Sequence, residues 1–159
     1  MEKKQLSVVL IVLAVAVVFD VVGCSSTPPT PSLYDVSATA DRTVNVSYRV
    51  TDQQAYAIAK AWFNLDMSKY AYSRIVTDDS TGGVLATTGG YVYNDNYDNI
   101  TWSSRIIIAD GIARIDLTTK SIGRYDSRYV SRADGQDSVK QFANYYADET
   151  IKSFREAFN

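Results

Sequence analysis

The sequence predicts an α+β domain in which an antiparallel sheet of about five strands carries two helices on one face. Three observations predict this class: an early segment with period-two alternation, two segments with apolar residues at three- and four-residue spacing, and an Asp-Gly hairpin between those two segments. Each predicted helix has one apolar stripe and the hairpin has one apolar face, so a two-layer arrangement buries all three. The expected order of elements is β-α-β-β-β-β-α.

Residues 1–23 are predicted to be a secretory leader. A basic pair, Lys3-Lys4, precedes an apolar run from Leu6 to Val22, and the small residue Gly23 follows it. Basic, apolar and small residues in this order are typical of a signal peptide. A retained membrane span is the alternative for a run of this length. Asp20 would be costly in a lasting span, and no cluster of Lys or Arg follows to stop transfer, so the leader is favoured.

Cys24 is the predicted lipid attachment site. The ending Val21-Val22-Gly23-Cys24 resembles the bacterial lipobox, in which an apolar residue and a small residue precede an acceptor cysteine. A thiol can be thioether-linked to a diacylglycerol, and two or three acyl chains such as palmitate hold a protein durably on a membrane. Ser25 and Ser26 follow, without the Asp that often retains a lipoprotein in the inner membrane. We therefore expect an envelope protein in the outer membrane of a two-membrane host, facing the periplasm or the cell surface.

Two segments are expected after the leader. Residues 24–42 are rich in Ser, Thr, Pro and Ala with little apolar periodicity, and such a segment buries too little surface to offset its conformational entropy. They are predicted to form a lipidated, flexible tether. Residues 43–159 are predicted to form a single domain of ordinary size.

The residues that are missing exclude several kinds of chemistry. The chain has no histidine and one cysteine, which the anchor uses, so Ser-His-Asp and Cys-His catalysis, His-ligated zinc and disulfides are excluded. The formal net charge of −2 offers no basic field for nucleic acid. No cofactor is expected, and a non-enzymatic role is favoured.

The first strand and the first helix are predicted to adjoin. Val44, Val46, Tyr48 and Val50 alternate with polar residues, as in a strand with one covered face. Thr51 or Asp52 can then cap a helix. The helix has an apolar stripe at three- and four-residue spacing, formed by Ala55, Ile58, Ala59, Trp62, Phe63 and Met67.

Two strands are predicted next, over Ser73–Asp78 and Val84–Tyr93. The loop between them, Asp79–Gly83, has glycines that permit the positive φ of a hairpin. Gly89-Gly90 lies inside the second strand and predicts a bulge or a bend there.

The segment Ile100–Thr119 is predicted to be a hairpin. Asp110-Gly111 is a preferred pair for a two-residue type I′ turn. Counting back from the turn gives the register. On the apolar face, which Trp102 shares, it pairs Ile108 with Ala113, Ile106 with Ile115 and Ser104 with Leu117. On the other face it pairs Arg105 with Asp116 and Ile107 with Arg114.

A final helix is predicted from Asp134 or Asp137 to Phe158. A polar stretch after Gly123 leads to it. Its apolar stripe is formed by Val139, Phe142, Ala143, Tyr146, Thr150, Phe154 and Phe158.

Several segments resemble a known family of envelope proteins. They are Gln54–Phe63, Ile75-Val76 with Asp78 and Asp79, Gly82–Leu85 and Ile106–Arg114. Together they look like DUF4468, a domain of unknown function, and the resemblance covers about Val44 to Asp116. It implies a TBP-like fold, which agrees with the element order above. It implies no activity.

For each of two groups of acidic residues, a functional and a purely structural interpretation are possible. Asn94–Asn99 offers oxygen ligands as a calcium loop does, but its sixth place lacks glycine and Arg105 stands where the bidentate Glu belongs, so a solvated strand connection is preferred. Asp78 and Asp79 could serve as an acid/base pair. Adjacent strand residues point to opposite faces, so a role near the turn is preferred.

The sheet face that no helix is expected to cover is the predicted partner surface. Its residues would include Ser47, Arg49, Arg105, Arg114 and Asp116, and Tyr91 and Tyr93 are added as candidates for stacking. The leading hypothesis is a membrane-tethered module that binds an envelope protein or glycan. The alternative is a small hydrolase that uses Asp with Tyr or Ser and no histidine, and two convergent carboxylates in a cleft would favour it.

Overall fold

A computed structural model of the chain describes residues 32–67, 72–94 and 98–159. The predicted leader, Cys24 and the first part of the predicted tether, residues 24–31, lie outside these residues, as does the middle of the Asn94–Asn99 run. The elements are β1 (Leu33–Ser47), α2 (Asp52–Trp62), the π-helix η1 (Phe63–Met67), β2 (Tyr72–Asp79), β3 (Val84–Asn94), β4 (Asp98–Ala109), β5 (Ile112–Asp126) and α3 (Arg132–Ala157). Neither helix within these ranges is long and apolar enough to cross a membrane.

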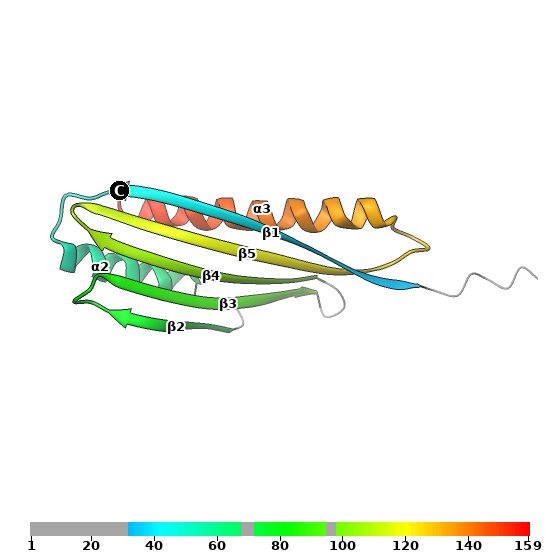
Figure 1. The fold of residues 1–159 in the computed structure, drawn as a ribbon, viewed down its shortest axis with the longest axis horizontal. Coiled ribbons are helices and arrows are strands. Elements are labelled where there is room, and N and C mark those ends of the chain that lie inside the picture. Colours follow the sequence, from blue (N-terminus) through cyan, green and yellow to red (C-terminus); the bar gives the residue numbers. More distant parts are fainter. Residues whose placement is uncertain (1–31, 68–71, 95–97) are drawn as a thin grey trace, which may run out of the picture. The chain divides into compact units, whose positions relative to one another are not determined.

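The five strands form one antiparallel sheet in the order β1-β5-β4-β3-β2. Figure 1 shows both helices behind the sheet, with α3 along β1 and β5 and α2 beside β3 and β4. The predicted class, with two helices on one face of an antiparallel sheet, is confirmed. The face toward the viewer of Figure 1 is the open face.

The tether predicted over residues 24–42 is wrong for its second half, because β1 begins at Leu33. Leu33–Arg42 pair with Leu117–Asp126 of β5 in unbroken register. Val36 and Ala40 are buried on the helix side, Ala38 between them is half-buried, and Ser37 and Thr39 are exposed on the open face. The alternation was present in the sequence, but two of its inward positions are alanines. Small side chains give little apolar contrast, so the segment resembled a loop.

The predicted hairpin is confirmed in every pair. Ile108 opposes Ala113, Ile106 opposes Ile115 and Arg105 opposes Asp116. Asp110 and Gly111 have φ of 53° and 76°, as a type I′ turn requires. The ladder continues beyond the predicted ends, to Asp98 and Gly123.

The bulge predicted at Gly89-Gly90 is wrong. Both glycines pair regularly with Thr101 and Trp102 of β4, and the irregularities of β3 and its partners lie at Ile75/Thr77 and Val92/Asn94 instead. A side chain at Gly89 would collide with the indole of Trp102, and one at Gly90 with the ring of Tyr72. The glycines therefore make room for aromatic neighbours.

Both helices begin at a side-chain cap, and the cap of α2 is the predicted Thr51. Thr51 Oγ1 accepts from Gln54 N at 3.2 Å and the Gln54 side chain accepts from Thr51 N at 3.0 Å, which forms a capping box. Helix α3 begins earlier than predicted, at Arg132, because Ser131 Oγ accepts from Asp134 N at 3.1 Å.

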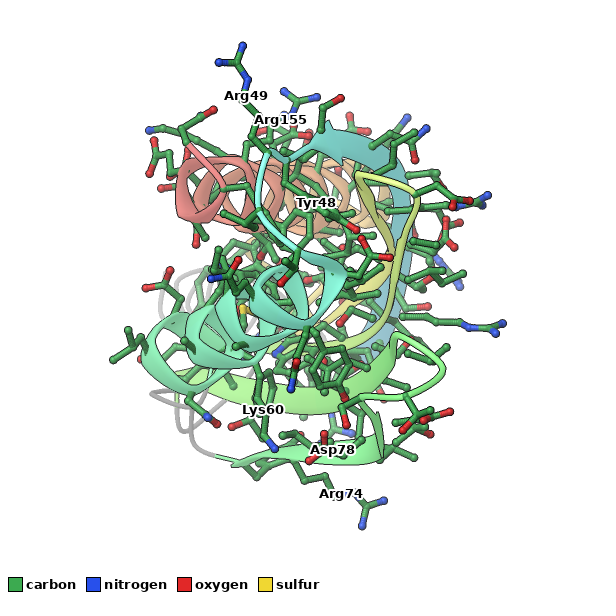
Figure 2. The ribbon with its side chains drawn as sticks, turned by 90° about the vertical axis from the view of Figure 1, so that its left-hand side faces the viewer. Tyr48, Arg49, Lys60, Arg74, Asp78 and Arg155 are labelled. Atoms are coloured by element: carbon green, nitrogen blue, oxygen red, sulfur yellow. The ribbon has the colours of Figure 1, made fainter. Side chains whose placement is uncertain are left out.

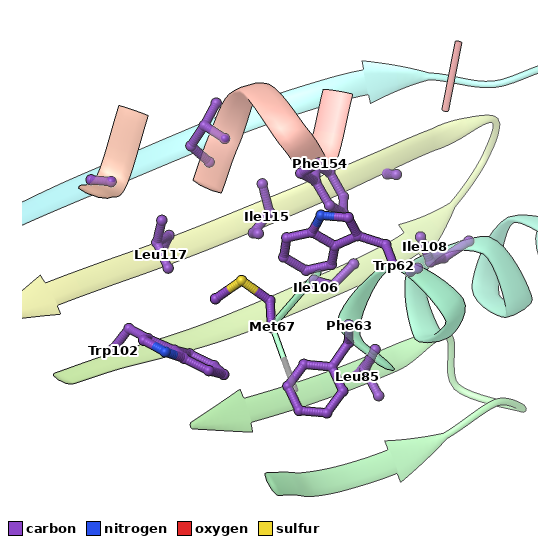
Figure 3. Packing of buried hydrophobic residues seen from close by; sticks show 14 of the residues in the cluster. Trp62, Phe63, Met67, Leu85, Trp102, Ile106, Ile108, Ile115, Leu117 and Phe154 are labelled. Atoms are coloured by element: carbon purple, nitrogen blue, oxygen red, sulfur yellow. The ribbon is translucent and has the colours of Figure 1, made fainter. Parts of the chain in front are cut away.

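One hydrophobic core lies between the sheet and the helices. The predicted stripes are buried or half-buried, and Tyr56, which was not predicted, is buried with them. Figure 3 shows Trp62 of α2 beside Phe154 of α3, above Ile106 and Ile115 of the sheet. The rings of Trp62 and Phe154 meet edge to face with centroids 5.1 Å apart.

Candidate binding surface on the open sheet face

A shallow hollow lies in the middle of the open face, across four of the five strands and with Val76 of β2 at its border. Its volume is ≈ 550 Å³. Antiparallel neighbours place alternate residues of β1, β5, β4 and β3 on this face. Its outward-facing lining is mostly hydroxyl and charged side chains, including Asp41, Thr88, Ser103, Arg105, Asp116 and Thr118.

The carboxylates of the hollow are held by side chains of the same or the adjacent strand. Asp116 accepts from Thr43 Oγ1 at 2.8 Å and pairs with Arg114 at 2.9 Å. Asp41 accepts from Thr118 Oγ1 at 2.6 Å. The Arg114 guanidinium, with help from Thr43 and Arg105, lowers the pKa of Asp116, so that carboxyl is ionised at neutral pH.

Among the described side chains that line the hollow, Arg105 is the cation with free donors. It lies opposite Asp116 in the β4–β5 register and its side chain is exposed. Within the part of the chain that the structure describes, its guanidinium makes no hydrogen bond or ion pair, and it acts on Asp116 only through space. A guanidinium offers five N–H donors in a planar fork that fits carboxylates and other paired acceptors. Arg105 is therefore the group most available to a ligand.

The structure brings together three of the predicted surface residues, Arg105, Arg114 and Asp116. Ser47 is exposed at the end of β1. Arg49 lies in the connection from β1 to α2, outside the strands, and Figure 2 shows its side chain at the edge of the molecule, so its predicted place in the surface is wrong. Asp41 and Thr118 were missed, although the alternation of polar residues from Asp35 to Thr43 would have found Asp41.

Tyr91 lies on the helix side of the sheet, so its predicted place on the open face is wrong. It lines a groove of ≈ 410 Å³ together with Met67 of η1 and residues of α3. The regular register at Gly89-Gly90 determines this side, because Tyr91 is two residues from the inward-facing Gly89. The side chain of Tyr93 lies outside the described part of the chain.

A hydrogen-bonded link joins the two helices beside this groove. Trp62 Nε1 donates to Ser153 Oγ, and Ser153 Oγ donates to Asp66 Oδ2, each at 2.7 Å. The link crosses from α2 through α3 to η1. It satisfies the indole N–H and holds the π-helical turn against α3.

Asp78 and Asp79 point to opposite faces, as predicted. Asp78 faces α2, where its carboxylate accepts from Tyr56 Oη at 2.7 Å and Lys60 Nζ at 2.6 Å. Figure 2 shows Lys60 reaching from α2 toward Asp78. Asp79 accepts from Gly82 N at 2.8 Å in the turn. The Lys60 ammonium, followed by Tyr56, lowers the pKa of Asp78, and burial raises the pKa of the Tyr56 phenol.

Among the residues that the structure describes, no cluster of three or more acidic, cysteine or histidine side chains could hold a metal ion. The Asn94–Asn99 run falls partly outside those residues, so the structure does not describe its ligand geometry.

Solved structures share this fold. A DUF4468 family protein from Bacteroides ovatus ATCC 8483 aligns with a TM-score of 0.56 at 15% identity, over 76% of this chain and 85% of that chain. A TBP-like protein from Parabacteroides distasonis ATCC 8503 aligns with a TM-score of 0.53 at 13% identity, over 75% of this chain and 92% of that chain. No protein-family model and no curated protein matches the sequence. The predicted DUF4468-like, TBP-like fold is confirmed.

Proposed function

We propose that the protein is a lipoprotein of the bacterial cell envelope, anchored through Cys24, and that its domain binds an envelope protein or glycan through the open sheet face. The observation that carries the binding role is the hollow around Arg105, with its unengaged guanidinium among hydroxyl side chains. The sequence supports the anchor through the lipobox-like Val21–Cys24 that follows an apolar leader.

The arrangement of charges favours a partner that presents acceptors. Asp116 already accepts hydrogen bonds from Arg114 and Thr43, so its carboxylate does not need a donor from a ligand. Arg105 keeps its donors free and is exposed, and arginine is enriched in protein interfaces because its fork binds acceptors in pairs. A carboxylate of an envelope protein, or the carboxylate or hydroxyl oxygens of a glycan, would accept hydrogen bonds from these free donors of Arg105.

The hydrolase alternative has one supporting feature, since the hollow contains two carboxylates, Asp41 and Asp116. Hydrolysis by a carboxyl pair needs one member to hold a proton at the working pH. Arg114 lowers the pKa of Asp116, which opposes that role. Asp41 is engaged by Thr118. Binding without catalysis is therefore the proposed function.

A photo-crosslinking experiment in the native envelope tests the binding role. A photoreactive amino acid at Ser103, which lines the hollow, should form a discrete crosslinked product in cells. Arg105→Glu should abolish that product, because it replaces the free donors with a like charge for the expected acceptors. Arg74→Glu, an exposed arginine of β2 outside the hollow, is the matched control and should keep the product. Equal products from both variants would refute the role of Arg105.

Metabolic labelling tests the anchor separately. The wild-type chain should incorporate labelled palmitate and fractionate with membranes, whereas Cys24→Ser should lose both the label and processing, because serine cannot form the thioether. Unchanged labelling and membrane partition in Cys24→Ser would refute the anchor and leave the open face as a separate question.

A further inference from the structure

Two large side chains are exposed at the end of the domain where β1 begins. Leu33 is 56% exposed and Tyr129 is 81% exposed. Ser127 N donates to Ser32 O at 3.2 Å, so the connection from β5 to α3 lies against the start of β1. Figure 1 shows this connection and the start of β1 at the same end of the sheet. We name Leu33 and residues 127–132 the Leu33 end.

The Leu33 end is held in place without the Tyr129 ring. Tyr34 Oη donates to Ser131 O at 2.7 Å and Tyr129 N donates to Asp126 O at 3.0 Å. Arg128 pairs with Asp126 at 2.6 Å and lies over the Tyr129 ring, 5.3 Å from its centroid. The fold therefore fixes the backbone here and leaves an aromatic and an aliphatic side chain in solvent.

The chain between Cys24 and Leu33 is short. Fully extended, it spans at most about 32 Å. The opposite end of β1, at Ser47, lies about 46 Å further along the strand. If Cys24 is lipidated, the Leu33 end is thus kept within reach of the membrane surface.

We propose that the Leu33 end rests on the lipid bilayer, with Leu33 and Tyr129 in the headgroup region; this inference rests on the proposed lipid anchor. Tyrosine favours the membrane interface because its ring is apolar and its hydroxyl is polar. Arg132, exposed at the start of α3 three residues after Tyr129, can donate to lipid phosphates. The nearby acids are engaged, since Asp126 binds Arg128 and Asp134 accepts from Ser131. The contact would set the orientation in which the anchored domain presents its open face.

The single cysteine of the chain makes a sharp test possible. In the mature lipoprotein Cys24 is blocked as a thioether, so Ser127→Cys or Ser47→Cys supplies one free thiol for a nitroxide label. Both positions are exposed, and they lie at opposite ends of β1. In vesicles of phosphatidylcholine and phosphatidylglycerol, the ratio of oxygen to nickel-chelate accessibility should be several-fold higher at position 127 than at position 47.

Variants then identify the side chains responsible. Leu33→Ser combined with Tyr129→Ser should lower the ratio at position 127 to that at position 47. Val50→Ser combined with Ile112→Ser, which removes two apolar side chains that are 43% and 44% exposed elsewhere, should not change it. Circular dichroism checks that both double variants are folded.

Vesicle flotation separates the two ways in which the inference can fail. If the labelled lipoprotein floats with the vesicles but the labels at positions 127 and 47 report the same water-like accessibility, the contact is overturned and the anchor stands. If the wild-type lipoprotein does not float, the anchor fails and the contact falls with it.

Discussion

Gly89 and Gly90 are neighbouring glycines of β3 at which an added side chain would meet an aromatic ring. A Cβ at Gly89 would lie 2.7 Å from the carbonyl oxygen of Tyr72 and against the buried indole of Trp102. A Cβ at Gly90 would meet only the ring of Tyr72, which is 56% exposed and can turn away. The two glycines therefore differ in how far their neighbours can yield.

We expect Gly89→Ala to lower the free energy of unfolding by about 1–3 kcal/mol, as overpacking of a core does. Gly90→Ala should stay within about 1 kcal/mol of the wild type, because relief of the glycine's backbone entropy offsets the displacement of Tyr72. Urea denaturation of both variants measures this. Equal losses of unfolding free energy in the two variants would show that the contact with Trp102 does not cause the expected difference between them.

Asp78 is the residue that ties α2 to the edge strand β2. Its pKa is lowered by Lys60 and then by Tyr56. A carboxyl whose folded-state pKa lies below its unfolded value stabilises the fold above the unfolded pKa, and this stabilisation is lost as the pH falls through the folded pKa. The contribution of Asp78 is thus present at neutral pH and absent in strong acid.

Asp78→Asn should accordingly reduce the free energy of unfolding at pH 7 and make no difference at about pH 2. Both side chains of the Lys60–Asp78 pair are 41% exposed, so solvent screens the effect and salt should reduce it further. Asp137→Asn, at an exposed position of α3, is the control and should differ little from the wild type at either pH. A loss that persists in acid would contradict the ionic explanation.

At the scale of elements, the length of β1 has the largest effect on the core and on the open face. The segment Leu33–Arg42 of β1 adds Asp41 to the open-face hollow and places Val36 in the core. Its position is also held from the other layer, because Arg42 Nε pairs with Asp148 of α3 at 2.7 Å. A strand that contacts both β5 and α3 is part of the domain and not a linker.

Val36→Ala tests this directly. Val36 is 5% exposed, and removing two buried carbons should cost about 1.5 kcal/mol or more of unfolding free energy. Val50→Ala, at a position 43% exposed, should cost clearly less. Chemical denaturation gives both values, and a neutral result at Val36 would restore the tether interpretation for this segment.

At the scale of the whole molecule, one hydrophobic cluster joins both helices to the sheet. It includes Trp62 of α2, Trp102 of β4 and Phe154 of α3. Neither helix can separate from the sheet without exposing core residues that the other helix also contacts. Folding of the domain should therefore be cooperative.

Unfolding in urea should accordingly follow a single transition. The fluorescence of Trp62 and Trp102 reports the core, and far-ultraviolet circular dichroism reports the helices, so the two curves should coincide. Ser153→Ala removes the acceptor of the Trp62 indole and should shift both midpoints together. Separate midpoints would indicate that the helices unfold independently of the sheet.

Much of the fold could be predicted from the sequence because the signals are local. Asp110-Gly111 fixes the turn, and period-two alternation on either side fixes the register of β4 and β5. Thr51 with Gln54 fixes the start of α2. Arg105 and Asp116 could be placed opposite each other by the same count. The anchor at Cys24 is likewise a prediction from the sequence alone.

Only the tertiary structure decided the positions that depend on distant partners. Leu33–Arg42 form a strand because β5 supplies their hydrogen bonds, and the weak alternation of this segment does not by itself establish that pairing. Tyr91 faces the helices because Gly89 makes room for Trp102 across the sheet, which keeps β3 in register. Asp41 lines the hollow because the same pairing with β5 places it opposite Thr118. Periodicity reports which face a residue shares with its neighbours, whereas the pairing of distant strands sets where that face lies.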